Sequence, residues 1–155
     1  MSAQVDHELD VRELLPHDGP MVLVDRILRH GPSETACVVD VSTQDLFRDR
    51  DGSIPLWVGL EYMAQCSAVH AAAAAVGTGV GEPGHSILLV SVRNLRFHCD
   101  RFRGRWIEAV AHRRAGRGAV AEFDCMLRDL ETGELLAEGR LYGLRRRSGE
   151  AAFDA

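Results

Sequence analysis

One segment of the chain is apolar at almost every position, whereas the rest mixes polar and apolar residues. It runs from Leu56 to Val76 and is rich in Ala, Leu and Met, which favour helices. Pro55 directly before it suits a helix start, and the glycines at 77, 79 and 81 suit a helix end. Polar residues at 61, 65 and 70 argue against a membrane span. We therefore expect one long helix over 56–76, buried inside the protein.

Four strand-length segments follow this helix, and each contains β-branched or aromatic residues. They are Ser86–His98, Arg105–Arg113, Gly118–Arg128 and Leu135–Arg145. In the third, apolar residues at 121, 123, 125 and 127 alternate with polar residues at 122, 124 and 128, which is typical of a half-buried strand. Glycine-containing turns at 115–118 and 131–133 separate neighbouring segments, so we expect antiparallel hairpins.

Two further strands are expected before the long helix. They cover Met21–His30 and Glu34–Val41 and are joined by a short Gly-Pro turn. Upstream of them, Asp10 is expected to cap a helical turn that runs through Leu15, because Pro16 then stops it.

This order of elements predicts an α+β fold in which an antiparallel β-sheet wraps around one long central helix. That arrangement buries the apolar helix and one face of the sheet against each other. The chain has 155 residues, which is the length of one domain. We expect a single domain over 1–147 and a flexible tail over 148–155.

Composition and charge exclude several classes of function. The chain has 18 basic and 23 acidic residues and a net charge of −5, which argues against general nucleic-acid binding. All the basic residues are Arg, so Schiff-base and P-loop chemistry that needs Lys is excluded. The N-terminal segment lacks the basic and apolar regions of a signal peptide, and the four cysteines form no CxxC pair. We therefore expect a cytoplasmic protein with reduced thiols and no membrane segment.

No motif points to a metal or to a nucleophilic serine. The chain contains no HExxH motif, no Cys/His pair with ligand spacing and no GxSxG elbow. Its Gly77–Gly84 stretch has neither a preceding strand nor a following helix, so it is not expected to bind phosphate. We expect no metal and no bound cofactor.

The predicted helix contains one carboxylate with a polar neighbour. Glu61 lies near the helix start, and Gln65 lies one turn later on the same face. A buried, unpaired carboxylate has a raised pKa and suits a general acid. Equally, Glu61 fits a solvated position in the first helical turn, where the helix dipole favours it. His17 follows Pro16 in a loop, where a lone histidine is more often a surface or anchoring residue.

Two motifs together resemble the hot-dog-fold 3-hydroxyacyl-acyl-carrier-protein dehydratases of type II fatty-acid synthesis. Leu15–His17 followed by PMVLVDR at 20–26 resembles the family's LPHRxPFLLVDRV opening. LEYMAQ at 60–65 resembles its LEAMAQ helix motif, at the corresponding distance. Taken together, the sequences of these two motifs are most similar to those of the divergent dehydratase-like subunits of aryl-polyene biosynthesis clusters. The resemblance covers nearly the whole chain and implies a hot-dog fold.

The resemblance also implies a site and reveals a departure from it. In the family, a glutamate at the position of Glu61 acts with a histidine in a GHFP loop, which lies fourteen residues earlier. Here that position is Phe47. Three alternatives follow: His17 supplies the base beside Glu61, a paired hot-dog subunit donates a histidine, or the chain is a non-catalytic partner subunit.

Substrate-binding residues follow from the same resemblance. Pro55 matches the proline of the family's PGV turn, and Leu56 replaces its glycine while keeping a backbone N–H for a thioester oxygen. Gln65 is expected to orient Glu61 or to line an acyl tunnel, which Trp57 and Met63 would shape.

The implied activity is dehydration of a β-hydroxyacyl thioester in fatty-acid or polyene assembly. The substrate would be carried on the phosphopantetheine of an acyl carrier protein, and the chain would form a homodimer or a heterodimer with a second hot-dog subunit. Eight arginines against two acids over 93–117 suit an acidic carrier protein, although a solvated strand face explains them equally well. The alternative activity is a hot-dog acyl thioesterase.

Overall fold

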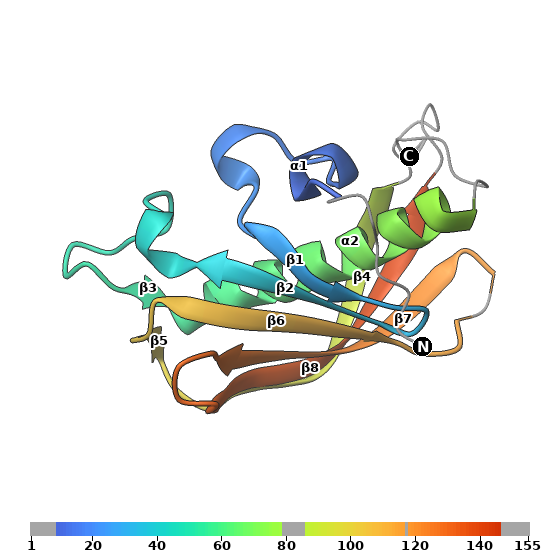
Figure 1. Ribbon diagram of the computed structural model, residues 1–155. Coiled ribbons are helices and arrows are strands. Elements are labelled where there is room, and N and C mark those ends of the chain that lie inside the picture. Colours follow the sequence, from blue (N-terminus) through green and yellow to red (C-terminus); the bar gives the residue numbers. More distant parts are fainter. Residues whose placement is uncertain (1–8, 79–85, 117, 147–155) are drawn as a thin grey trace, which may run out of the picture.

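The computed structural model describes residues 9–78, 86–116 and 118–146. In it an antiparallel sheet of six strands curls around the long helix α2 (Gly59–Thr78), as Figure 1 shows. The strand order is β1-β2-β6-β7-β8-β4. The bounds are β1 (Arg26–His30), β2 (Glu34–Asp40), β4 (Ser86–Phe97), β6 (Trp106–Arg113), β7 (Val120–Asp129) and β8 (Leu135–Arg146). The expected sheet around one central helix is confirmed.

Shorter elements complete the fold. Two short strands, β3 (Ile54–Pro55) and β5 (Arg101–Phe102), pair with each other beside the start of α2. Helix α1 (Val11–Leu14) is capped by the Asp10 side chain, as expected. Single 3₁₀ turns are η1 (Gly19–Met21), η2 (Val41–Thr43) and η3 (Leu56–Val58). The tail expected at 148–155 lies outside the described residues.

One predicted strand boundary is wrong. The expected strand over Met21–His30 begins only at Arg26, because the preceding backbone groups bind side chains instead of another strand. The expected helix over 56–76 begins as the 3₁₀ turn η3, and α2 follows from Gly59. A Cβ at Gly59 would lie 2.4 Å from Leu127 Cδ1, so this close approach of helix and sheet requires glycine.

The hydrophobic core lies between α2 and the concave face of the sheet. On β7, residues 121, 123, 125 and 127 are buried and residues 122, 124, 126 and 128 are half-buried, so the predicted alternation is confirmed. Tyr62, Met63 and Val69 of α2 are fully buried, as are Ile107 and Leu141 of the facing strands. Because α2 is apolar on most of its surface, the sheet curls around it rather than lying flat against one side.

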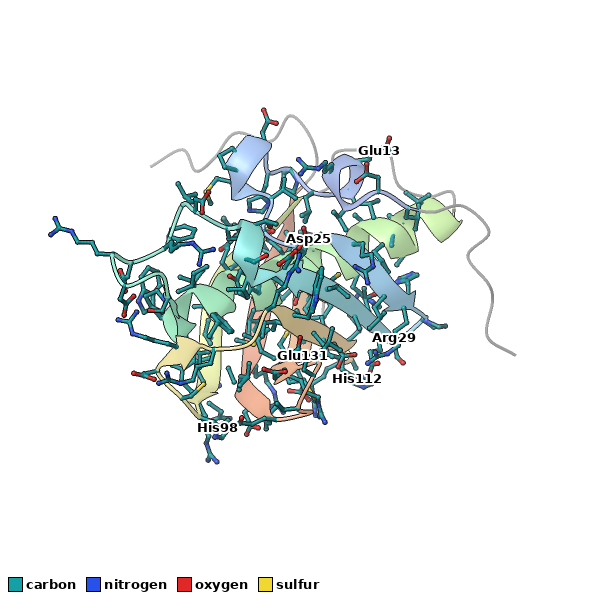
Figure 2. All side chains as sticks on the ribbon, turned by 60° about the vertical axis from the view of Figure 1, so that its left-hand side comes forward. Glu13, Asp25, Arg29, His98, His112 and Glu131 are labelled. Atoms are coloured by element: carbon teal, nitrogen blue, oxygen red, sulfur yellow. The ribbon has the colours of Figure 1, made fainter. Side chains whose placement is uncertain are left out.

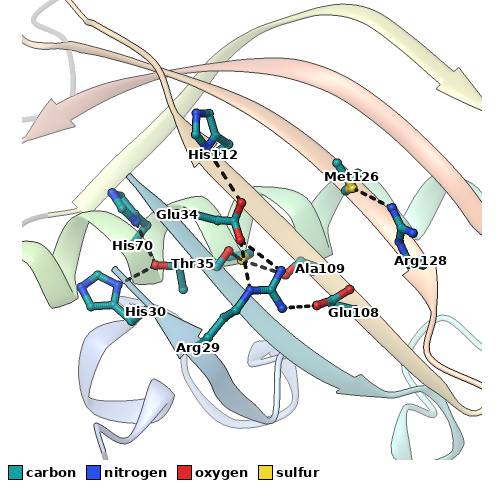
Figure 3. Close-up of polar contacts among 11 residues, drawn as sticks. Arg29, His30, Glu34, Thr35, His70, Glu108, Ala109, His112, Met126 and Arg128 are labelled. Atoms are coloured by element: carbon teal, nitrogen blue, oxygen red, sulfur yellow. Dashed lines mark hydrogen bonds and ion pairs between the residues drawn. The ribbon is translucent and has the colours of Figure 1, made fainter. Parts of the chain in front are cut away.

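A buried histidine cluster lies away from the start of α2. The Thr35 hydroxyl lies 2.8 Å from His70 Nδ1 and 2.6 Å from His30 Nδ1 (Figure 3). Since a hydroxyl has one hydrogen, it donates to one imidazole and accepts from the other. The His70 ring also packs edge-on against Phe123, with centroids 5.8 Å apart. Burial, together with the nearby His30, lowers the pKa of His70 to about 4.

This cluster predicts an acid-sensitive fold. The unfolded chain takes up a proton at His70 near pH 6.5, whereas the folded chain does so only near pH 4, so stability falls as the pH falls between these values. We expect His70 to contribute a loss on the order of 2 kcal/mol between about pH 7 and pH 4.5. His70→Gln, which does not titrate, should flatten this dependence in urea unfolding. His98→Gln on the surface should keep it, and equal slopes for both variants would contradict the assignment.

Candidate active site

The two residues named from the sequence as acid and base lie together. His17 Nε2 is 3.2 Å from Glu61 Oε1, and the two side chains remain 28% and 36% exposed. His17 lies in the loop between α1 and η1, and Glu61 lies in the first turn of α2. The site is therefore an open histidine–carboxylate pair at the start of the central helix.

Gln65 holds this pair and the loop in place. It is fully buried, and its Nε2 donates to Glu61 Oε1 at 3.1 Å and to the Met21 carbonyl at 2.7 Å. Its Oε1 accepts from the Leu23 N–H at 2.9 Å. Both donor hydrogens and the acceptor of the amide are thus in use. Gln65 orients Glu61 and also fixes the loop that carries His17 against α2.

The hydrogen bonds leave defined atoms available for chemistry. His17 Nδ1 is buried without a hydrogen-bond partner, so protons can reach this ring only through Nε2. Within the described residues, both contacts to Glu61 are made at Oε1, and the second carboxylate oxygen is left for a ligand. The arrangement offers one exchangeable imidazole nitrogen and one carboxyl oxygen side by side, as general acid–base chemistry requires.

The remaining residues expected in the site take different positions. Trp57 is 61% exposed one turn before Glu61, and its ring meets Phe47 edge-on with centroids 6.1 Å apart. Met63 and Leu56 are buried in the core. The Leu56 N–H already donates to the Asp100 carbonyl at 2.8 Å. Pro55 is half-buried in β3 and pairs with β5. The structure thus brings Glu61, His17 and Gln65 into direct contact, while Met63 faces the core.

Sequence reasoning missed two residues next to this site. The Tyr62 hydroxyl donates to Gln44 Oε1, and Gln44 Nε2 donates to the Leu23 carbonyl at 2.6 Å. Both side chains are buried. The only signal in the sequence is the position of Tyr62 beside Glu61, and nothing in it links Gln44 to Leu23.

Two other described histidines, His98 and His112, each lie beside a different carboxylate, Glu138 and Glu34 respectively. Figure 2 shows His98 and His112 apart from each other at the outer surface. Among the described residues, no group of three His, Cys, Asp or Glu side chains is placed to hold a metal ion. In the same residues, no helix has the length and apolarity needed to cross a membrane.

Four of the eight arginines over the basic segment 93–117 are paired with acids. Within 101–114, ion pairs join Arg101 to Asp49, Arg103 to Asp100, Arg105 to Asp40 and Arg114 to Asp124. Two others lie over aromatic rings, Arg93 on Tyr142 and Arg113 on Phe123. The positive charge seen in the sequence is therefore partly neutralised on the same surface.

Comparisons with solved structures identify the fold. A structure of the dehydratase heterocomplex ApeI:P from Xenorhabdus doucetiae has a TM-score of 0.83 and 24% identity, covering 93% of this chain and 95% of that one. A thioesterase from Haemophilus influenzae has a TM-score of 0.60 and 16% identity, covering 83% and 82%. Zebra fish thioesterase superfamily member 2 has a TM-score of 0.60 and 20% identity, covering 86% and 91%. These likenesses confirm the predicted hot-dog fold.

Sequence comparison supplies the family. Among curated proteins, none is significantly similar to the chain. A family model for ApeP-like proteins, described as ApeP dehydratase, matches residues 9–152. That range includes the His17 loop, the whole of α2 and every strand of the sheet. Because the match spans nearly the entire sequence, the chain belongs to the ApeP-like dehydratase family.

Proposed function

We propose that this chain is a 3-hydroxyacyl-acyl-carrier-protein dehydratase, or the catalytic subunit of one, in fatty-acid or aryl-polyene assembly. The observation that carries the proposal is the contact of 3.2 Å between His17 Nε2 and Glu61 Oε1. This contact places a candidate base beside a candidate acid, although Phe47 occupies the position at which the hot-dog dehydratases have their histidine. Of the three alternatives for the missing base, this contact favours His17.

The elimination needs one proton to be taken and one to be given. Neutral His17 removes the proton from the α-carbon through Nε2, since Nδ1 is buried. The electron pair forms the double bond, and the β-hydroxyl departs as water with the proton of Glu61. The carboxylate then recovers a proton from the adjacent imidazolium, so the pair returns to its starting state. Gln65 keeps Glu61 oriented throughout through its hydrogen bond to Oε1.

A second hot-dog subunit belongs to the proposal because one sheet edge is open. The sheet ends at β1 on one side and β4 on the other. Strand β1 has five residues and carries Arg26 and Arg29, whereas β4 has twelve and exposes Leu88 and Val90 in its first half, ahead of Arg93 and Arg96. A long edge with exposed apolar residues favours addition of another strand more than a short charged edge does. The structurally similar ApeI:P is a heterocomplex, which supports a partner of the same fold for this chain.

An acyl carrier protein is the proposed donor of the substrate, held on its phosphopantetheine. The chain would use no other cofactor. Since many arginines in the basic segment are already paired, the contact with an acidic carrier protein should be modest and weakened by added salt.

Removing either member of the pair should abolish dehydration. Glu61→Gln and His17→Ala should each reduce turnover of a 3-hydroxyacyl thioester on carrier protein by at least about a hundredfold. Enoyl formation is followed by ultraviolet absorbance, with circular dichroism as the check of folding. The matched control is His98→Asn, which removes a surface histidine 3.7 Å from Glu138 and should leave turnover unchanged.

The same assay separates the alternatives. Full activity of Glu61→Gln would reject the proposal. Release of free thiol without an enoyl product would identify a thioesterase. If wild-type protein acts only after a second hot-dog chain is added, and His17→Ala remains fully active in that mixture, the partner supplies the base.

The open edge gives an assembly prediction. Val90→Lys places a charge on a β4 position that is 51% exposed, so it should convert the assembled protein, homodimer or heterodimer, into single chains in sedimentation velocity. Leu130→Lys, at a similarly exposed apolar position beyond β7, should leave assembly unchanged. Assembly that persists in Val90→Lys would show that another surface joins the subunits.

A further inference from the structure

We propose that Gln44 and Tyr62 are positioning residues for the His17–Glu61 pair. The inference rests on the proposed function, because it assigns these two buried side chains a role in that reaction. Neither side chain forms a hydrogen bond with the side chain of His17 or Glu61. They act through the backbone of Leu23, which lies in the segment that follows His17.

The contacts form a chain that begins and ends on α2. The Tyr62 hydroxyl donates to Gln44 Oε1, and Gln44 Nε2 donates to the Leu23 carbonyl at 2.6 Å. The Leu23 N–H donates to Gln65 Oε1 at 2.9 Å. Both polar backbone groups of Leu23 are therefore bound to side-chain amides. Tyr62 and Gln65 belong to the same helix as Glu61, so α2 fixes the loop and the carboxylate together.

Burial makes this series of hydrogen bonds rigid. Tyr62 is fully buried and Gln44 is 8% exposed, so neither polar group can exchange its partner for bulk water. Gln44 is itself held at the end of η2, because its N–H donates to the carbonyl of Val41, the first residue of that turn. Asp40 caps η2 through Ser42 and is held by an ion pair of 2.9 Å with Arg105. The anchor thus extends to the framework of the sheet.

Loss of these hydrogen bonds should lower the rate of catalysis rather than the affinity for substrate. His17 reaches Glu61 across 3.2 Å, and nothing buried holds its Nδ1. Its position depends on the backbone that Gln65 and Gln44 fix at Met21 and Leu23. A displacement of about 1 Å in a catalytic group is enough to lower turnover by up to about a hundredfold. Through Gln44, these hydrogen bonds also link the His17 loop to the segment that contains Phe47, which lies three residues after Gln44.

Two substitutions remove the links without changing side-chain volume greatly. Gln44→Met leaves the Leu23 carbonyl without its donor, and Tyr62→Phe removes only the hydroxyl. In the assembled protein, Gln44→Met should lower kcat at least about tenfold with less than about threefold change in KM, and Tyr62→Phe should act in the same direction but less. The matched control is Ser67→Ala, which removes another buried hydroxyl of α2, one that donates to Met63 O. It should keep the wild-type kcat.

A second readout does not depend on activity. The His17 ring Cε1–H resonance in heteronuclear NMR reports its contact with Glu61. In Gln44→Met it should move toward its position in Glu61→Gln, and in Ser67→Ala it should stay at the wild-type position. Unchanged His17 resonance and kcat in Gln44→Met, with only a lower melting temperature, would overturn the inference. An inactive wild-type assembly would instead refute the proposed function, and the resonance would still test the positioning.

Discussion

The burial of α2 is the constraint on which the rest of the structure depends. Its residues from Gly59 to Val76 are apolar on nearly every side, with Glu61 as the only charged residue. A single flat sheet covers one side of such a helix, so the chain curls six strands around it. Close approach at Gly59 brings the sheet into direct contact with the helix start. The helix that organises the core therefore also carries Glu61, the proposed acid of the site.

This arrangement explains why polar loops lie against an apolar helix. The segment after His17 has apolar side chains that enter the core, yet its backbone groups need partners once they are buried. Gln65 and Gln44 supply those partners from two directions. Under the proposed mechanism, the same amides that satisfy the backbone would also fix the distance between His17 and Glu61. Stability and catalytic geometry would then depend on the same few hydrogen bonds.

The features that the sequence predicts correctly are those set by residues close together along the chain. The helix and the alternation in β7 follow from spacing along the chain, and the contact of Glu61 with Gln65 follows from their separation by one turn. The apolar run at 21–24 has the composition of a strand, but its backbone binds side chains 21 and 42 residues away. Such pairings depend on how the chain closes in space, so neither that boundary nor the role of Gln44 was predictable.

The start of α2 leaves a small, mostly apolar face accessible beside Glu61. Trp57 in η3 and then Leu60, Glu61 and Ala64 in the first turns of α2 are at least partly accessible, at spacings of three or four residues. Apolar residues surround the one carboxylate on this face. Dehydration expels water, and proton transfer between close groups is more effective where bulk water is excluded. A bound acyl chain and a neighbouring subunit would both exclude water there, so the same apolar stripe that is unfavourable in an isolated chain suits an assembled dehydratase.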